Sequence, residues 1–167
     1  LPWLIINLGT AFLASFVVGM FSKTIEKVVI LSAVMSIVTG MGGNAGTQSL
    51  SVTIRALALG EVDRRDTLKI VGKSFLVGAI NGGLLGLVCG SILGIIYGNF
   101  FIGLIMFLAM IGNLIVACTI GFVVPITLKA LKVDPAMASA VLLTTATDVF
   151  GFLIFLSLAT IFLDKLV

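Results

Sequence analysis

Five long apolar stretches constrain this chain more than any other feature of its sequence. A helix that crosses the hydrocarbon core of a bilayer needs about 20 mostly apolar residues. Because unpaired backbone groups are costly in lipid, a stretch of that length is predicted to be an α-helix. Residues 1–167 are therefore predicted to form one all-α membrane domain with five transmembrane helices per subunit. The predicted helices span about residues 2–21, 28–58, 74–97, 101–128 and 136–163.

The composition agrees with a membrane protein and narrows the chemistry. The chain is 60% hydrophobic and 10% charged, whereas a soluble domain is about 45–50% apolar and about 25% charged. Histidine is absent, which removes the commonest zinc and copper ligand and the usual base at neutral pH. Because no nucleophile–base pair is found either, we do not expect an enzyme. A nucleic-acid partner is not expected either. Cys89 and Cys118 lie in separate apolar stretches, without CxxC spacing, and are predicted to be packed thiols.

The charged loops predict the orientation of the chain. Five spans place the two termini on opposite faces, and positively charged loops stay cytoplasmic. We therefore predict a multi-pass protein of the plasma membrane with a cytoplasmic N-terminus and an external C-terminus. Because the chain begins at Leu1 rather than Met, a cytoplasmic N-terminal part is expected to be missing. The basic residues predicted inside are Arg55, Arg64, Arg65, Lys69, Lys73, Lys129 and Lys132, and those outside are Lys23, Lys27 and Lys165.

The second apolar stretch contains a polar block, Gly40–Met41–Gly42–Gly43–Asn44–Ala45–Gly46–Thr47–Gln48. Glycine weakens a helix by roughly 0.5–1 kcal/mol relative to alanine, and a side-chain amide needs a partner where water is absent. Gly42 and Gly46 form a GxxxG pair, so helix packing alone could explain them. Packing does not explain Asn44 and Gln48, which lie four residues apart on one helix face. Together these residues favour a pore wall.

The third stretch carries a glycine at every fourth position from Gly78 to Gly98. Residues four apart form a ridge on one face of a helix, and a ridge of glycines lets another backbone come close. Tight helix packing is therefore predicted for this face, rather than a ligand path. Pro125 is predicted to kink or stop the fourth helix, and Pro135 to begin the fifth.

One aspartate, Asp148, lies near the middle of the fifth stretch. Placing an aspartate at the centre of a membrane helix costs roughly 2.5–3.5 kcal/mol of insertion free energy. No Lys or Arg lies at similar depth to neutralise Asp148. Three states stay open: a protonated acid, a carboxylate in a water-filled cavity, or a carboxylate that holds a cation. Thr144 and Gly151 lie one turn away on the same face, and an oxygen-only environment suits Mg²⁺, Ca²⁺ or Mn²⁺. A functional acid is favoured over one that only hydrogen-bonds a neighbouring helix.

At these residues the chain resembles the membrane domain of the MgtE family of magnesium channels and transporters. The resemblance covers nearly the whole chain, with the same number and order of spans. The combination of a GGNxGxQ block with a downstream TTxxD makes it specific. Family members often carry proline where this chain has Ser36 and Val141. The matching segments are Gly40–Ser49, Arg55–Glu61, Asp134–Ser139 and Thr144–Gly151.

The resemblance implies a homodimer whose ion path runs along the dimer axis, lined by the second and fifth helices. It implies that Asp148 coordinates the hydrated ion and that the chain around Thr144 contributes oxygens near it. Mg²⁺ is the expected cargo, with Mn²⁺, Co²⁺ or Ca²⁺ left open. In a full-length chain, cytoplasmic regulatory domains before the first helix are also implied. The pore-lining residues predicted are Asn44, Gln48, Gly42, Gly43, Gly46, Thr145, Ala140 and Gly151.

Three functions remain open on this basis. In a passive magnesium channel, two copies of Asp148 face each other across a two-fold axis and form a charged ring that selects cations. In a coupled exporter or exchanger, Asp148 alternates between Mg²⁺ and H⁺ or Na⁺. In a glycine-zipper scaffold, the helices pack and no ion is transported. The passive channel is the reading that we favour.

Overall fold

Long α-helices make up the fold. The computed structural model describes residues 1–61 and 67–166, and within them the chain forms seven α-helices and no β-strand. Arg64 and Arg65, which contributed to the predicted orientation, lie outside the described residues. The helices are α1 (Pro2–Met20), α2 (Ser22–Lys27), α3 (Ile30–Leu59), α4 (Thr67–Ile96), α5 (Phe100–Ala130), α6 (Pro135–Ile161) and α7 (Leu163–Leu166).

The five predicted spans correspond to the five long helices. By length and composition, α1, α4, α5 and α6 are apolar enough to cross a membrane. The helix α3 is 30 residues long, but the polar Gly40–Gln48 block lowers its hydropathy, and α3 is not among these four candidates. Composition therefore supports four membrane helices, and the fifth remains a prediction.

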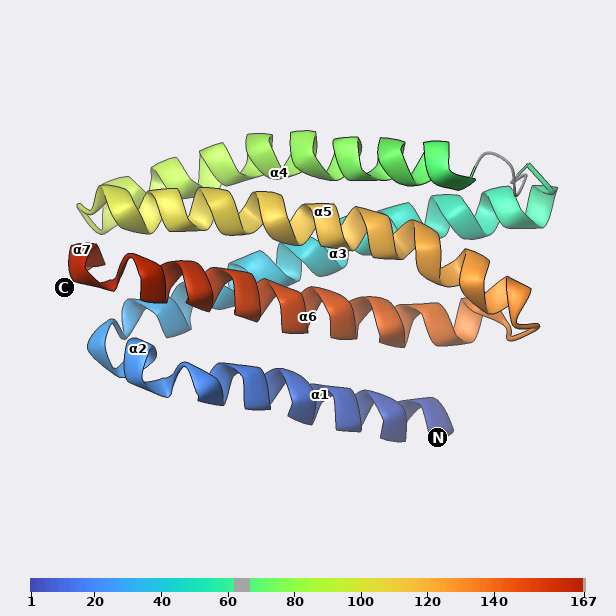
Figure 1. The fold of residues 1–167 in the computed structure, drawn as a ribbon, viewed down its shortest axis with the longest axis horizontal. Helices are drawn as coiled ribbons and strands as arrows, with labels where there is room; N and C mark the ends of the chain where they lie inside the picture. Colours follow the sequence, from blue (N-terminus) through green and yellow to red (C-terminus); the bar gives the residue numbers. More distant parts are fainter. Residues whose placement is uncertain (62–66, 167) are drawn as a thin grey trace.

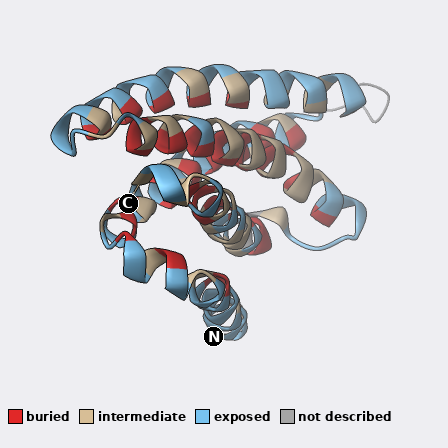
Figure 2. Ribbon diagram, turned by 60° about the vertical axis from the view of Figure 1, so that its left-hand side comes forward, coloured by how far each residue is buried: buried red, intermediate tan, exposed pale blue. Residues whose placement is uncertain are grey.

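The central helix of the bundle is α5. It packs against α4 on one side and against α3 and α6 on the other, while α1 contacts only α6 extensively. Figure 1 shows α4 and α1 at opposite edges of the bundle and the two termini at opposite ends. Burial follows the same order, because red segments concentrate on α5 and on the helix faces turned toward it (Figure 2).

The glycine stripe of α4 forms its contact with α5. A Cβ atom built on Gly82 would lie 2.6 Å from the Cα of Ile111, and one built on Gly86 would lie 2.9 Å from the carbonyl oxygen of Phe107. These are backbone atoms, which cannot rotate away as a side chain can. Only hydrogen atoms at these positions leave room for the α5 backbone, and the predicted tight packing is confirmed from Gly78 to Gly90. Gly98 does not take part, because it follows the end of α4, has a φ of 62° and has nothing within 4 Å of a Cβ.

The helix ends are set by local chemistry. The side chain of Asn99 accepts a hydrogen bond from the backbone N–H of Phe101 at 2.8 Å, which caps the start of α5. The predicted helix start at Pro135 is confirmed. Pro125 does not stop the fourth helix: α5 continues through it to Ala130 and bends near this end (Figure 1). Pro125 is buried, and a membrane helix tolerates proline where neighbouring helices and local backbone adjustments satisfy the freed carbonyl groups.

Candidate functional site

The two helices with the predicted site residues, α3 and α6, lie side by side and antiparallel. A Cβ on Gly46 would lie 2.6 Å from Cδ1 of Leu143, and a Cβ on Gly151 would lie 2.9 Å from Cγ2 of Thr39. Moving along α3 from Thr39 to Gly46 therefore means moving backwards along α6 from Gly151 to Leu143. This register places Asp148 level with the glycine block of α3, within about one helical turn of Asn44, because each helical residue advances about 1.5 Å.

One face of α3 is polar and uncovered. Asn44, Thr47, Gln48 and Ser51 are all exposed. The hydroxyls of Thr47 and Ser51 donate to carbonyl oxygens of their own helix, at 2.7 and 2.8 Å. The amides of Asn44 and Gln48 have no hydrogen bond within residues 1–61 and 67–166. Because unpaired amides are costly in lipid, this face requires water or a second protein surface.

At the same level along the bundle, α6 carries a carboxylate. Asp148 is half-buried near the middle of the helix, and its carboxylate has no hydrogen bond or ion pair in the described part of the chain. Thr144 is exposed one turn before it, and its hydroxyl donates to the carbonyl oxygen of Ala140 at 3.0 Å. The half-buried Thr145 donates to Val141 at 2.7 Å. Since a hydroxyl that donates still has free lone pairs, both threonines can also accept from a hydrated cation.

The glycines of the predicted pore set are placed differently from its polar members. Gly42, Gly46 and Gly151 are buried, and side chains of α5, α6 and α3 fill the space beside them. Gly43 is half-buried and has open space where a Cβ would lie. The three buried glycines serve helix packing within one protomer, and their lining of a pore stays a prediction. Asn44, Gln48, Ala140 and Thr144 are exposed, as a lining role requires.

A single protomer offers few ligands for a cation. The described residues contain no group of three or more His, Cys, Asp or Glu side chains. Magnesium prefers about six oxygens, but it keeps several waters and is often bound through only one or two carboxylates. One Asp148 with neighbouring hydroxyls is therefore too small a ligand set for a bare Mg²⁺ ion and suits only an ion that keeps most of its waters.

Comparison with known proteins decides the family. The profile of the MgtE family, described as "Divalent cation transporter", matches residues 35–158, which include Asn44 and Asp148. The chain belongs to the MgtE family. The resemblance inferred from the motifs is thereby confirmed.

Three relatives of this MgtE-family chain carry the name "Magnesium transporter MgtE". The Bacillus subtilis protein is 34% identical over 166 residues, covering 99% of this chain and 37% of the relative. The Enterococcus faecalis protein is 31% identical over 163 residues, covering 98% and 36%. The Thermus thermophilus protein is 34% identical over 167 residues, covering 97% and 36%. The chain thus spans little more than a third of the length of these relatives.

One residue beside the candidate site was not singled out from the sequence. Asn113 of α5 is fully buried, and its Nδ2 donates to the carbonyl oxygen of Val38 on α3 at 2.8 Å. The same side chain lies against Gly42 of α3 and Gly151 of α6. The available signal was an amide near the middle of an otherwise apolar span, because polar side chains in membrane helices commonly bridge to neighbouring helices.

Proposed function

We propose that this chain transports Mg²⁺ across a membrane through a path that it forms with a second copy of itself. One structural observation carries the proposal: the half-buried, unpaired Asp148 lies level with the uncovered polar face of α3. A two-fold related copy that covers this face would shield it from lipid and bring a second Asp148 to the axis. The three relatives named magnesium transporters support Mg²⁺ as the cargo.

The chemistry of the paired site follows from charge and hydration. Two carboxylates across an axis repel each other, and a divalent cation between them removes that repulsion. Mg²⁺ gives up water reluctantly, so the Asp148 pair binds the hydrated ion, while Thr144 and Asn44 hydrogen-bond to its waters. An inward-negative potential favours entry by roughly 2.3 kcal/mol per charge per 100 mV, which drives a divalent ion inward without another energy source.

The same proposal makes α3 the fifth membrane helix. Its polar face would be buried at the dimer interface and along the ion path, so lipid would contact only its apolar sides. The helix α3 is long enough to span a bilayer, but its mean hydropathy is modest. Mean hydropathy assumes that lipid surrounds the whole helix, and this assumption does not hold for a helix whose polar face lies in a protein interface. The pore would then be lined by α3 and α6 of both copies.

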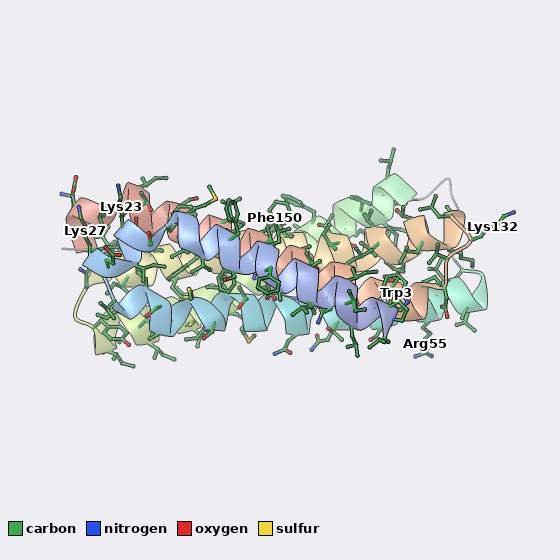
Figure 3. The ribbon with its side chains drawn as sticks, turned by 90° about the horizontal axis from the view of Figure 1, so that it is seen from below. Trp3, Lys23, Lys27, Arg55, Lys132 and Phe150 are labelled. Atoms are coloured by element: carbon green, nitrogen blue, oxygen red, sulfur yellow. The ribbon has the colours of Figure 1, made fainter. Side chains whose placement is uncertain are left out.

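The distribution of basic side chains supports an N-terminus in the cytoplasm and a C-terminus outside. Arg55 and Lys132 lie at one end of the bundle, and Lys23 and Lys27 lie at the other (Figure 3). The Arg55 end also carries Lys129, which donates to Leu57 at the end of α3, and the first two turns of α4, which begins at that end, carry Lys69 and Lys73. The opposite end gains only Lys165 of α7 among the described residues. The end with Arg55 and Lys132 is also the end where the N-terminus lies (Figure 1), and basic loops favour the cytoplasmic side of the plasma membrane. Regulatory domains carried by a longer chain before α1 would be cytoplasmic as well.

The test is Mg²⁺ uptake into liposomes that contain the reconstituted chain and a trapped magnesium indicator. Asp148→Asn keeps the size of the side chain and removes its charge, so uptake should fall roughly tenfold or more. The matched control is Asp164→Asn, because Asp164 is exposed on the short helix α7, and uptake should be unchanged. Undiminished uptake in Asp148→Asn would refute the role of this carboxylate. No uptake by the wild-type chain would favour a non-transporting scaffold.

A coupled exporter or exchanger is the second candidate, and the same unpaired carboxylate favours it. A carboxylate with no fixed basic partner can exchange Mg²⁺ for H⁺ or Na⁺. Uptake that requires an opposing H⁺ or Na⁺ gradient would support exchange, whereas uptake driven by membrane potential alone supports the channel. Competition by Mn²⁺, Co²⁺ or Ca²⁺ in the same assay measures selectivity. Either mechanism is transport, in keeping with the family's description, and neither involves an enzymatic reaction.

A further inference from the structure

Three helices meet at the side chain of Asn113. A Cβ built on Gly42 of α3 would collide with its amide, and a Cβ built on Gly151 of α6 would lie 2.9 Å from Nδ2. The Nδ2 group donates to Val38 of α3 at 2.8 Å. Since Gly151 follows Asp148 by less than one helical turn, this amide lies close to the level of the carboxylate proposed to bind the ion.

The orientation of this amide is fixed by its partner. The carbonyl oxygen of Val38 can only accept a hydrogen bond, so Nδ2 and not Oδ1 must face it. The Oδ1 atom is then left buried with no hydrogen-bond partner among the described residues. Unsatisfied buried acceptors are rare and costly. A leucine has the same branching and the same number of side-chain heavy atoms, and it would fill the space without this cost.

Stability alone therefore gives a poor reason for an amide at this position. Its distinctive contribution is a directional bond that holds α3 at one height and one distance relative to α5, while the same side chain packs against α6. Functional groups must be held within about 0.5 Å of the productive geometry to act together. Apolar packing at position 113 would fill the space but leave the sliding of α3 less restricted.

We propose that Asn113 is a positioning residue, which sets the separation between the polar face of α3 and Asp148 on α6 and thereby sets the affinity for the transported ion. This inference rests on the proposed transport function. The side chain is fully buried, so it would not touch the ion, and its hydrogen bond and close glycine contacts join it to Val38, Gly42 and Gly151.

The first measurement is the magnesium dependence of uptake by the intact chain carrying Asn113→Leu. We expect the Mg²⁺ concentration at half-maximal uptake to rise roughly five- to tenfold, while maximal uptake is largely kept. A change of this size corresponds to the net free energy of one hydrogen bond. The matched control is Asn81→Leu, the same change at an exposed position midway along α4. A merely structural role would lower the amount of folded protein and leave the half-maximal concentration unchanged.

The second measurement does not depend on transport. Spin labels at Ile37→Cys on α3 and Phe150→Cys on α6 report the separation of the two helices, since both positions are exposed. Cys89 and Cys118 are first replaced by serine, and labelled chains are diluted with unlabelled chains. We expect Asn113→Leu to shift or broaden the distance distribution and Asn81→Leu to leave it unchanged.

The outcomes separate this inference from the transport proposal. A changed distance distribution together with a raised half-maximal concentration supports the positioning role. Unchanged distances, or an unchanged half-maximal concentration, overturn it. If the wild-type chain shows no uptake, the transport proposal fails, and the distance measurement still decides whether Asn113 sets the separation of α3 and α6.

Discussion

The neighbouring glycines Gly82 and Gly83 of α4 offer a controlled test of the α4–α5 contact. A Cβ on Gly82 would lie 2.6 Å from the Cα of Ile111 and 3.0 Å from the carbonyl oxygen of Met110, whereas nothing lies within 4 Å of a Cβ on Gly83. Alanine at either position gains the same helix propensity, roughly 0.5–1 kcal/mol over glycine. The two substitutions therefore differ only in whether the new methyl group meets α5.

The magnitude follows from the geometry. The 2.6 Å separation at Gly82 is well short of the contact distance of about 3.5–4.0 Å between carbon atoms. The obstructing atoms are backbone, so the two helices must separate locally, and overpacking of this kind costs about 1–3 kcal/mol. We expect Gly83→Ala to stabilise the protein slightly. We expect the free energy of unfolding of Gly82→Ala to be lower than that of Gly83→Ala by about 1–3 kcal/mol.

Reversible unfolding in mixed micelles, followed by the loss of helical circular dichroism, measures both variants against the wild-type chain. Equal unfolding free energies for Gly82→Ala and Gly83→Ala would refute the reasoning, because they would show that the close approach of α5 at Gly82 does not exist. If Gly83→Ala lowered the free energy of unfolding more than Gly82→Ala, then Gly83 and not Gly82 would lie on the face of α4 that contacts α5.

Two further predictions concern the helix ends. Asn99→Ala removes the cap of α5 and the 3.1 Å bond from Nδ2 to the carbonyl oxygen of Lys165, and thermal unfolding should show a loss of about 1 kcal/mol in stability. Asn99→Asp keeps the oxygen that accepts the capping bond, so its loss of stability should be smaller. Equal losses of stability in the two variants would contradict the capping role. Lys129→Met removes the 2.9 Å bond from Nζ to the carbonyl oxygen of Leu57 and should speed amide hydrogen exchange at the end of α3 about three- to tenfold. Unchanged exchange there would show that this bond does not restrain α3.

Much of the fold was accessible from the sequence because lipid imposes a simple rule on the backbone. Each predicted span became a long helix, and the glycine stripe of α4 became a helix contact. The predicted helix bounds were wrong where a helix extends beyond the apolar stretch of the sequence or forms outside it. The helix α4 begins at Thr67, ahead of the apolar stretch, because charged residues such as Lys69 continue a helix outside lipid. The predicted loop at residues 22–27 folds as α2.

The candidate site was only partly accessible. The unusual cost of an amide or a carboxylate in an apolar span identified Asn44 and Asp148 without any structure. That cost does not say which face of a helix is covered, so it could not separate the exposed Asn44 from the buried Gly42. It also could not identify Asn113, because the importance of that side chain depends on two other helices that converge on it.

The different attachment of α1 and α4 has a consequence for how the molecule responds to bilayer thickness. The helix α1 buries only Ala14 and Val17 and contacts α6 alone extensively, and its 19 residues are about 28 Å long, close to the hydrocarbon thickness of about 30 Å. The longer α4 and α5, with 30 and 31 residues, are joined along the glycine stripe and must tilt as a unit. A thinner bilayer would therefore increase the tilt of the α4–α5 pair while α1 stays nearly upright, so lipid composition would change the angle between them.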